Sequence, residues 1–143
     1  MALFNRFNLF TDDLVKGVLN FDSDIFKIML THSSPFATMH VYRDIEKYEI
    51  TEGYGYKTGG EVTEISLTNA DGVEVITAAS VTWNANGGSI GPFRYAVIYN
   101  TTPIIKTLVC WFDYNSSILL NKGESFTVEP NAATPSGKLF TLG

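Results

Sequence analysis

Short segments in which apolar and polar residues alternate at a period of two constrain this chain most, because successive side chains of a strand point to opposite faces. One face of residues 93–99 carries four large side chains, Phe93, Tyr95, Val97 and Tyr99. Residues 108–112 are apolar on both faces. Such a strand is covered on both sides, either by another sheet or by a neighbouring subunit.

Turn signals separate these segments from further predicted strands. The sequence Asn69-Ala70-Asp71-Gly72 predicts a hairpin turn. Residues 33–60, which include Pro35 and several glycines, are typical of a loop. About eight to ten short strands with frequent turns predict a mainly β protein, a β-sandwich with a jelly-roll-like layout. The other strands are predicted at residues 26–30, 62–68, 73–77, 81–83, 117–120, 125–129 and 138–142.

The N-terminal region differs from the rest. Residues 11–20 predict one short helix, with Thr11 as its N-cap and two aspartates in its first turn. Since no linker composition interrupts the chain, we expect a single domain over residues 1–143, with residues 1–24 forming an arm and a short helix packed on it. Three phenylalanines precede the predicted helix at a spacing of three, namely Phe4, Phe7 and Phe10. They either cover the edge of the sandwich or dock on another chain.

Composition narrows the classes of partner. The chain has 35 Thr, Ser and Asn residues against 25 charged residues, and its net charge is −5. A nucleic-acid partner is not expected, because phosphate binding requires a basic surface. No apolar run reaches the roughly 20 residues of a membrane-spanning helix, and the N-terminus lacks the pattern of a signal peptide, so no membrane partner is expected. Cys110, the single cysteine, is interpreted as an inert core thiol.

Motifs of catalysis are weak in this chain. Residues 87–91 match the G-x-S-x-G pattern around Ser89, but Pro92 and a predicted strand follow where the motif needs a helix, so a glycine-rich turn is favoured over a nucleophilic serine. His32, His40 and Asp44 have no common metal-ligand spacing. We therefore expect no enzymatic activity, no metal and no cofactor.

Three residues outside the arm are candidate protein contacts. Tyr54 and Tyr56 lie in a glycine-rich loop over residues 53–60, a composition that suits recognition loops. Ile104 lies in an apolar stretch just after Pro103, which is either an exposed contact or the start of a strand. With Phe4, Phe7 and Phe10, these residues form the predicted contact set.

Residues 88–100, with the sequence GSIGPFRYAVIYN, resemble small virion proteins of tailed bacteriophages and prophages. Further similar stretches occur in the same order over nearly the whole chain, and these motifs are structural. They are residues 12–20, 25–31, 53–60, 111–118 and 123–128.

The resemblance implies a jelly-roll-like cement or decoration protein. Such a protein is made in the bacterial host cytoplasm and binds the major capsid protein on the outer surface of the virion, usually as a homo-oligomer, a trimer or a dimer. An alternative is a component of the phage tail or of a head fibre, including a glycan-binding module. A small esterase that uses Ser89 is a third hypothesis.

Overall fold

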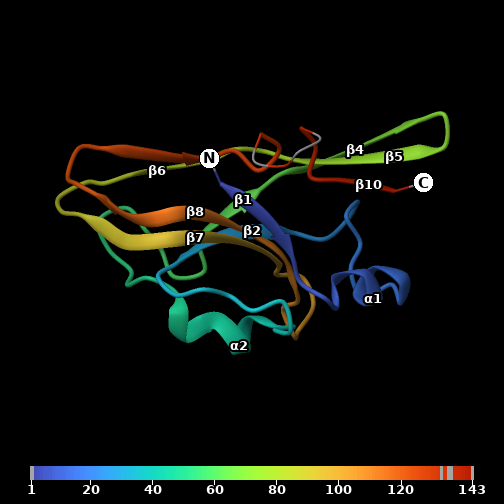
Figure 1. Cartoon of the computed structure of the whole chain (residues 1–143), viewed down its shortest axis with the longest axis horizontal. Coiled ribbons are helices and arrows are strands. Elements are labelled where there is room, and N and C mark those ends of the chain that lie inside the picture. Colours follow the sequence, from blue (N-terminus) through green and yellow to red (C-terminus); the bar gives the residue numbers. More distant parts are fainter. Residues whose placement is uncertain (1, 133, 135–136, 143) are drawn as a thin grey trace.

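The computed structural model describes residues 2–132, 134 and 137–142 (Figure 1). Strands are the main regular element of the chain, and the helical segments are short. The elements in chain order are β1 (Leu3–Arg6), α1 (Phe10–Val15), β2 (Phe26–Thr31), α2 (Tyr42–Ile45), the 3₁₀ turn η1 (Glu46–Tyr48), β3 (Glu61–Thr63), β4 (Ile65–Ala70), β5 (Val73–Ala78), β6 (Val81–Asn84), β7 (Ile90–Asn100), β8 (Leu108–Leu120), β9 (Ser125–Val128) and β10 (Phe140–Leu142). The predicted mainly β sandwich is confirmed, while its jelly-roll layout stays a prediction.

A five-stranded sheet in the order β1-β8-β7-β2-β3 forms the middle layer. Its neighbouring strands are antiparallel, and the long β7–β8 hairpin lies at its centre. Both strands are longer than the alternation predicts, because β7 continues through Gly91 and Pro92 and β8 continues through the polar residues around Asn115. The pairing of β7 with β8 shifts register between Phe93 and Tyr95, which changes the face on which later side chains lie.

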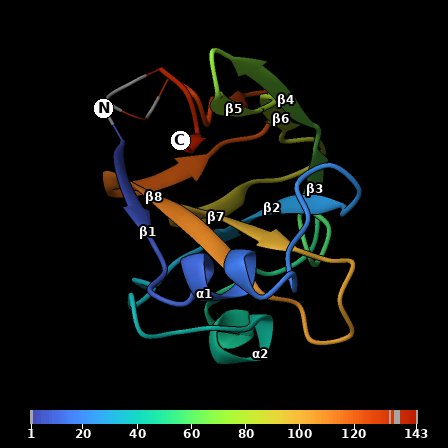
Figure 2. The same cartoon turned by 90° about the vertical axis from the view of Figure 1, so that its right-hand side faces the viewer.

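Two smaller sheets cover one face of the middle layer (Figure 1). One has the order β10-β5-β4 and the other pairs β6 with β9. Between the layers lies the larger apolar core, which includes Phe26, Ile28, Trp83, Ile98 and Phe112. α1 closes one end of this sandwich, the end that faces the viewer in Figure 2.

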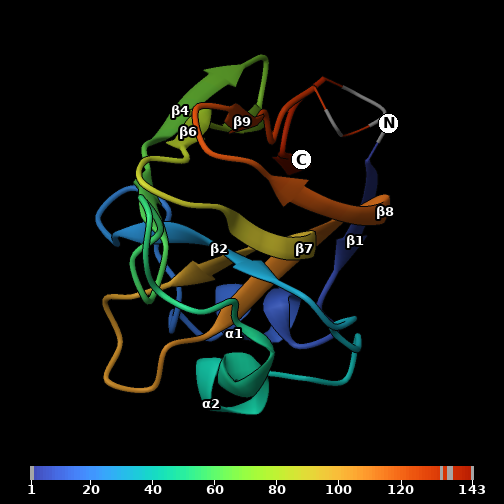
Figure 3. The same ribbon diagram turned by 90° about the vertical axis from the view of Figure 1, so that its left-hand side faces the viewer.

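A second, smaller core lies on the opposite face, where α2 and η1 cover the sheet (Figure 3). Met29, Val97, Leu108 and Trp111 of the sheet pack there with Ile45 of α2. Residues 108–112 are therefore covered on both faces by segments of their own chain. Of the two predicted alternatives, a second sheet or a neighbouring subunit, the two smaller sheets cover one face of these residues. The segment that carries α2 covers the other face.

Several local predictions were wrong. The helix begins at Phe10, with Leu9 instead of Thr11 as its N-cap. It ends at Val15, because Gly17 adopts a φ of 76° shortly after that residue. Phe93 packs in the larger core, while Tyr95, Val97 and Tyr99 pack in the smaller one, owing to the register shift. The predicted loop of residues 33–60 contains α2 and η1. In contrast, the β4–β5 hairpin turns at Asp71 and Gly72 as predicted.

Candidate docking surface

The six predicted contact residues divide into an inner and an outer group. Phe7, Phe10 and Tyr56 are buried, with 2% or less of each residue exposed, and Phe4 is half-buried. Tyr54 is 57% exposed and Ile104 is fully exposed. The prediction of Phe7, Phe10 and Tyr56 as partner contacts is therefore wrong, because the chain's own core already covers these side chains.

The phenylalanines of the arm pack on both faces of β8. The Phe7 ring lies 4.6 Å from the Trp111 ring in the smaller core. The Phe10 ring stacks on Phe140 at 4.5 Å, and Phe4 lies 5.6 Å from Phe112. Strand β1 pairs with β8 between them. Of the two alternatives for this arm, the structure therefore supports covering the edge of the chain's own sandwich.

Tyr56 belongs to a polar network around Glu49. The Glu49 carboxylate accepts hydrogen bonds from the Tyr56 hydroxyl at 2.5 Å, from the Tyr42 hydroxyl at 2.6 Å and from the Gly59 amide at 2.6 Å. Burial, reinforced by the negative charge of Glu49, raises the pKa of both tyrosines above the ordinary value. Both hydroxyls therefore keep their protons as donors, and the network fixes α2 and the loop of residues 53–60 on the sheet.

The β7–β8 loop, residues 101–107, is held at its base from two sides. The Thr101 amide and hydroxyl both donate to the Ile25 carbonyl, and the Ile25 amide donates to the Thr102 hydroxyl. On the other side, the Tyr42 amide donates to the Lys106 carbonyl at 2.8 Å. The tip of the loop extends into solvent, where Ile104 and Ile105 are 101% and 65% exposed.

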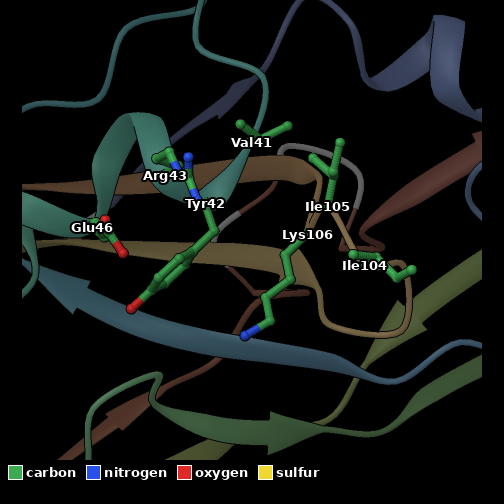
Figure 4. Close-up of a pocket in the computed structure, with 7 residues that line it drawn as sticks. All are labelled: Val41, Tyr42, Arg43, Glu46, Ile104, Ile105 and Lys106. Carbon is green, nitrogen blue, oxygen red and sulfur yellow. The ribbon is translucent and has the colours of Figure 1, made fainter.

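An open groove of about 580 Å³ lies between this tip and the start of α2. Figure 4 shows Ile104 and Ile105 on the loop side and Arg43 and Glu46 on the helix side. The Lys106 ammonium lies 5.4 Å from the centre of the Tyr42 ring, close enough for a cation–π contact. The groove therefore places two exposed isoleucines beside charged side chains of both signs.

The helix side of the groove is shaped by Asp44. Its carboxylate accepts hydrogen bonds from the amides of His40 and Val41, at 3.0 and 3.1 Å, and so caps α2. These bonds lower the pKa of Asp44 below its ordinary value. Val41 forms an isolated antiparallel β-bridge with Thr107, 66 positions further along the chain, so segments far apart in sequence form the two walls of the groove. Of the residues that line the groove, Ile104 is indicated by the local sequence pattern, whereas no local pattern signals the residues on the opposite wall, Val41, Tyr42, Arg43 and Glu46.

Tyr54 forms a second exposed feature, away from the groove. Its φ is 58°, and a Cβ atom on Gly88 would lie 2.6 Å from the Tyr54 ring. Glycine at position 88 thus lets the Tyr54 ring pack against the backbone there, while Tyr54 stays 57% exposed. The Tyr54 carbonyl also accepts a hydrogen bond from the Asn86 amide, which fixes the loop on the β6–β7 connection.

The remaining candidate residues do not converge on one site. His40 contacts the buried Asp13 carboxylate through Nε2 at 2.8 Å, whereas the Nδ1 atom of His32 lies 2.8 Å from the Ser33 hydroxyl. Asp44 caps α2 instead. Among the described residues, no group of three or more His, Cys, Asp or Glu is placed to hold a metal ion. Ser89 is followed directly by strand β7, which begins at Ile90, and not by the helix that the G-x-S-x-G motif needs. Cys110 is buried, and burial raises the pKa of its thiol.

Comparison of the chain with protein-family models, with curated proteins and with solved structures finds no match. In the part of the chain that the structure describes, no helix is long and apolar enough to cross a membrane.

Proposed function

We propose that this chain is a structural virion protein of the cement or decoration type, which binds the outer surface of the major capsid protein shell and stabilises it. The observation that carries the proposal is the isoleucine tip of the β7–β8 loop. Ile104 and Ile105 are exposed, yet the base of the loop is hydrogen-bonded on one side to Ile25 and on the other to Tyr42 of α2. The resemblance of residues 88–100 to small phage virion proteins supplies the context.

The tip suits this role for a physical reason. An exposed isoleucine removed from water on binding contributes about 1.5–3 kcal/mol. Because the base of the loop is already ordered, little conformational entropy is lost when the tip is covered. Arg43, Glu46 and Lys106 surround the tip and would orient a partner surface that carries both charges.

The test is binding of purified protein to expanded, undecorated capsids of a tailed phage. We expect binding at micromolar concentration, and a loss of at least about tenfold in affinity for the double variant Ile104→Ser and Ile105→Ser. The matched control is Val15→Ser with Val18→Ser, which removes two exposed apolar side chains from the α1 end. Failure of the unchanged protein to bind, or equal losses in both variants, would overturn the proposal.

Tyr54 favours a second candidate function, a glycan-binding component of the tail or of a head fibre. An exposed aromatic ring that packs against Gly88 is a platform on which a sugar ring stacks. Copy number per virion separates the two candidates, since hundreds of copies indicate the shell and a dozen or fewer indicate the tail. A glycan array without hits, or hits unchanged by Tyr54→Ala, would eliminate the glycan-binding version.

A further inference from the structure

Strand β4 is an unprotected sheet edge. In the described part of the chain six strands lie at sheet edges, and β4 is the longest of them, with six residues against three or four in each of the others. Its sequence, ISLTNA, contains no charged residue and no proline, which are the usual devices that block the pairing of edge strands. The β4–β5 hairpin also extends beyond the rest of the sandwich (Figure 1).

The hairpin turn determines which backbone groups of β4 face outward. Asp71 and Gly72 both have positive φ, 52° and 83°, which is the two-residue turn that hydrogen-bonds Ala70 to Val73. Alternation along an antiparallel pair then directs the amides and carbonyls of Ser66 and Thr68 to β5. Those of Ile65, Leu67 and Asn69 point away from it. Within the described residues, no other hydrogen bond reaches the backbone of β4.

We propose that β4 pairs with β4 of a second copy of this chain, antiparallel across a two-fold axis at Leu67, and joins the two three-stranded sheets into one. In this register Ile65 lies opposite Asn69 of the second copy and Leu67 lies opposite Leu67. The three outward residues of each strand then exchange six hydrogen bonds. The edge is thus complementary to itself, as a two-fold interface requires.

The uncharged strand and the apolar hollow beside it fit a second copy as the occupant. The chain carries a net charge of −5, but β4 itself is uncharged. Glu64, next to β4, lies opposite Ala70 and beside Asp71 of the second copy, so acidic side chains meet only at the two ends of the six-residue pairing, while the two Glu64 carboxylates are separated by roughly 20 Å. Leu67 lines a hollow of about 230 Å³ between the hairpin and α1, and a second Leu67 beside it covers more of that apolar surface.

The proposed register makes a specific charge-swap experiment possible, because Ser66 lies directly opposite Thr68 of the second copy. The double variant S66K and T68K places lysine against lysine twice, and we expect dimerisation to weaken at least about tenfold. The double variant S66K and T68E changes the same two exposed positions but places lysine against glutamate, so dimerisation is retained. The first variant lowers the net negative charge, so general charge repulsion predicts the opposite order.

The measurement is sedimentation velocity of the full chain at up to about 100 μM, with circular dichroism to verify folding. Hydrogen exchange adds an independent readout, since the amides of Ile65, Leu67 and Asn69 are expected to become protected as protein concentration rises. A monomeric wild-type chain would overturn the proposal. So would a dimer that tolerates both variants equally, since it would be formed by another surface. The interface does not depend on the proposed function, and capsid binding by a monomer would leave that function standing.

Discussion

The N-terminal arm and the β7–β8 loop carry similar apolar residues but use them in opposite ways. Phe7 and Phe10 of the arm are buried, whereas Ile104 and Ile105 of the loop are exposed. The arm lies along β8 as strand β1 and so reaches both cores, while the loop lies beyond the end of the sheet, where no other layer covers it. Position relative to the central sheet, and not side-chain apolarity, decides whether these residues stabilise the fold or remain available to a partner.

Phe10→Ala has the largest expected effect. Removing this ring leaves a cavity beside Phe140 and Phe21, and we expect a loss of about 3–5 kcal/mol in the free energy of unfolding, measured by urea denaturation. Deleting residues 1–10, which also removes β1, is expected to prevent folding. A folded deletion variant that loses only capsid binding would reverse the comparison and assign the arm to docking.

His40→Ala tests the attachment of the arm to the α2 segment. His40 is the side chain that contacts the Asp13 carboxylate, and only 3% of Asp13 is exposed. Removing the imidazole leaves that carboxylate without its partner, so we expect a loss of about 1–3 kcal/mol in the free energy of unfolding. Thermal melting of the double variant His40→Ala and Asp13→Asn is the control, because it removes the charge and is expected to recover part of the loss.

Lowering the pH is expected to remove the stabilisation that the Asp44 carboxylate gives to the start of α2. The pKa of Asp44 is lowered in the folded chain, so the unfolded chain binds this proton more readily. The stabilisation is therefore complete above the unfolded pKa of about 4 and is lost as the pH falls through the lower folded value. In urea denaturation at about pH 6 and pH 3, Asp44→Asn is expected to lower stability at the higher pH and to differ less from the unchanged chain at the lower.

Asp71→Asn is the control for this pH effect, since it removes a carboxylate from the exposed β4–β5 turn instead. If it reproduced the pH dependence of Asp44→Asn, the effect would reflect overall charge and not the cap of α2.

The double variant Ile104→Ser and Ile105→Ser has the smallest expected effect on stability. Neither side chain contributes to a core, so the free energy of unfolding is expected to change by no more than about 0.5 kcal/mol, even if capsid binding is lost. A loss comparable to that of Phe10→Ala would show that the tip packs on its own chain, and the contrast with the arm would disappear.

Much of the fold was predictable from local patterns. The alternation in residues 26–30 and the Asp71–Gly72 turn correspond to β2 and to the β4–β5 hairpin, because strand faces and two-residue turns depend on neighbouring residues. The face of Phe93 was not predictable, since a register shift between β7 and β8 decides it. Likewise, the brief turns of α2 carry too little periodicity to stand out within residues 33–60.

The candidate site was predictable only in part. Ile104 and Tyr54 were found because proline and glycine next to large apolar or aromatic residues mark exposed loops. Tyr56 has the same glycine neighbours as Tyr54 but is buried, since its hydroxyl reaches Glu49 and the Leu30 amide on the sheet. The opposite wall of the groove depends on the pairing of Val41 with Thr107, which joins distant parts of the chain.

By itself the sequence determined that the chain is mainly β, that many of its turns contain glycine, and that its net charge is −5. These properties follow from local sterics and from composition. Only the tertiary structure decided which apolar residues face outward, which strand is left as an open edge, and that one chain covers both faces of β8. Burial depends on contacts between residues far apart in sequence, and such contacts leave no periodic signal in either segment alone.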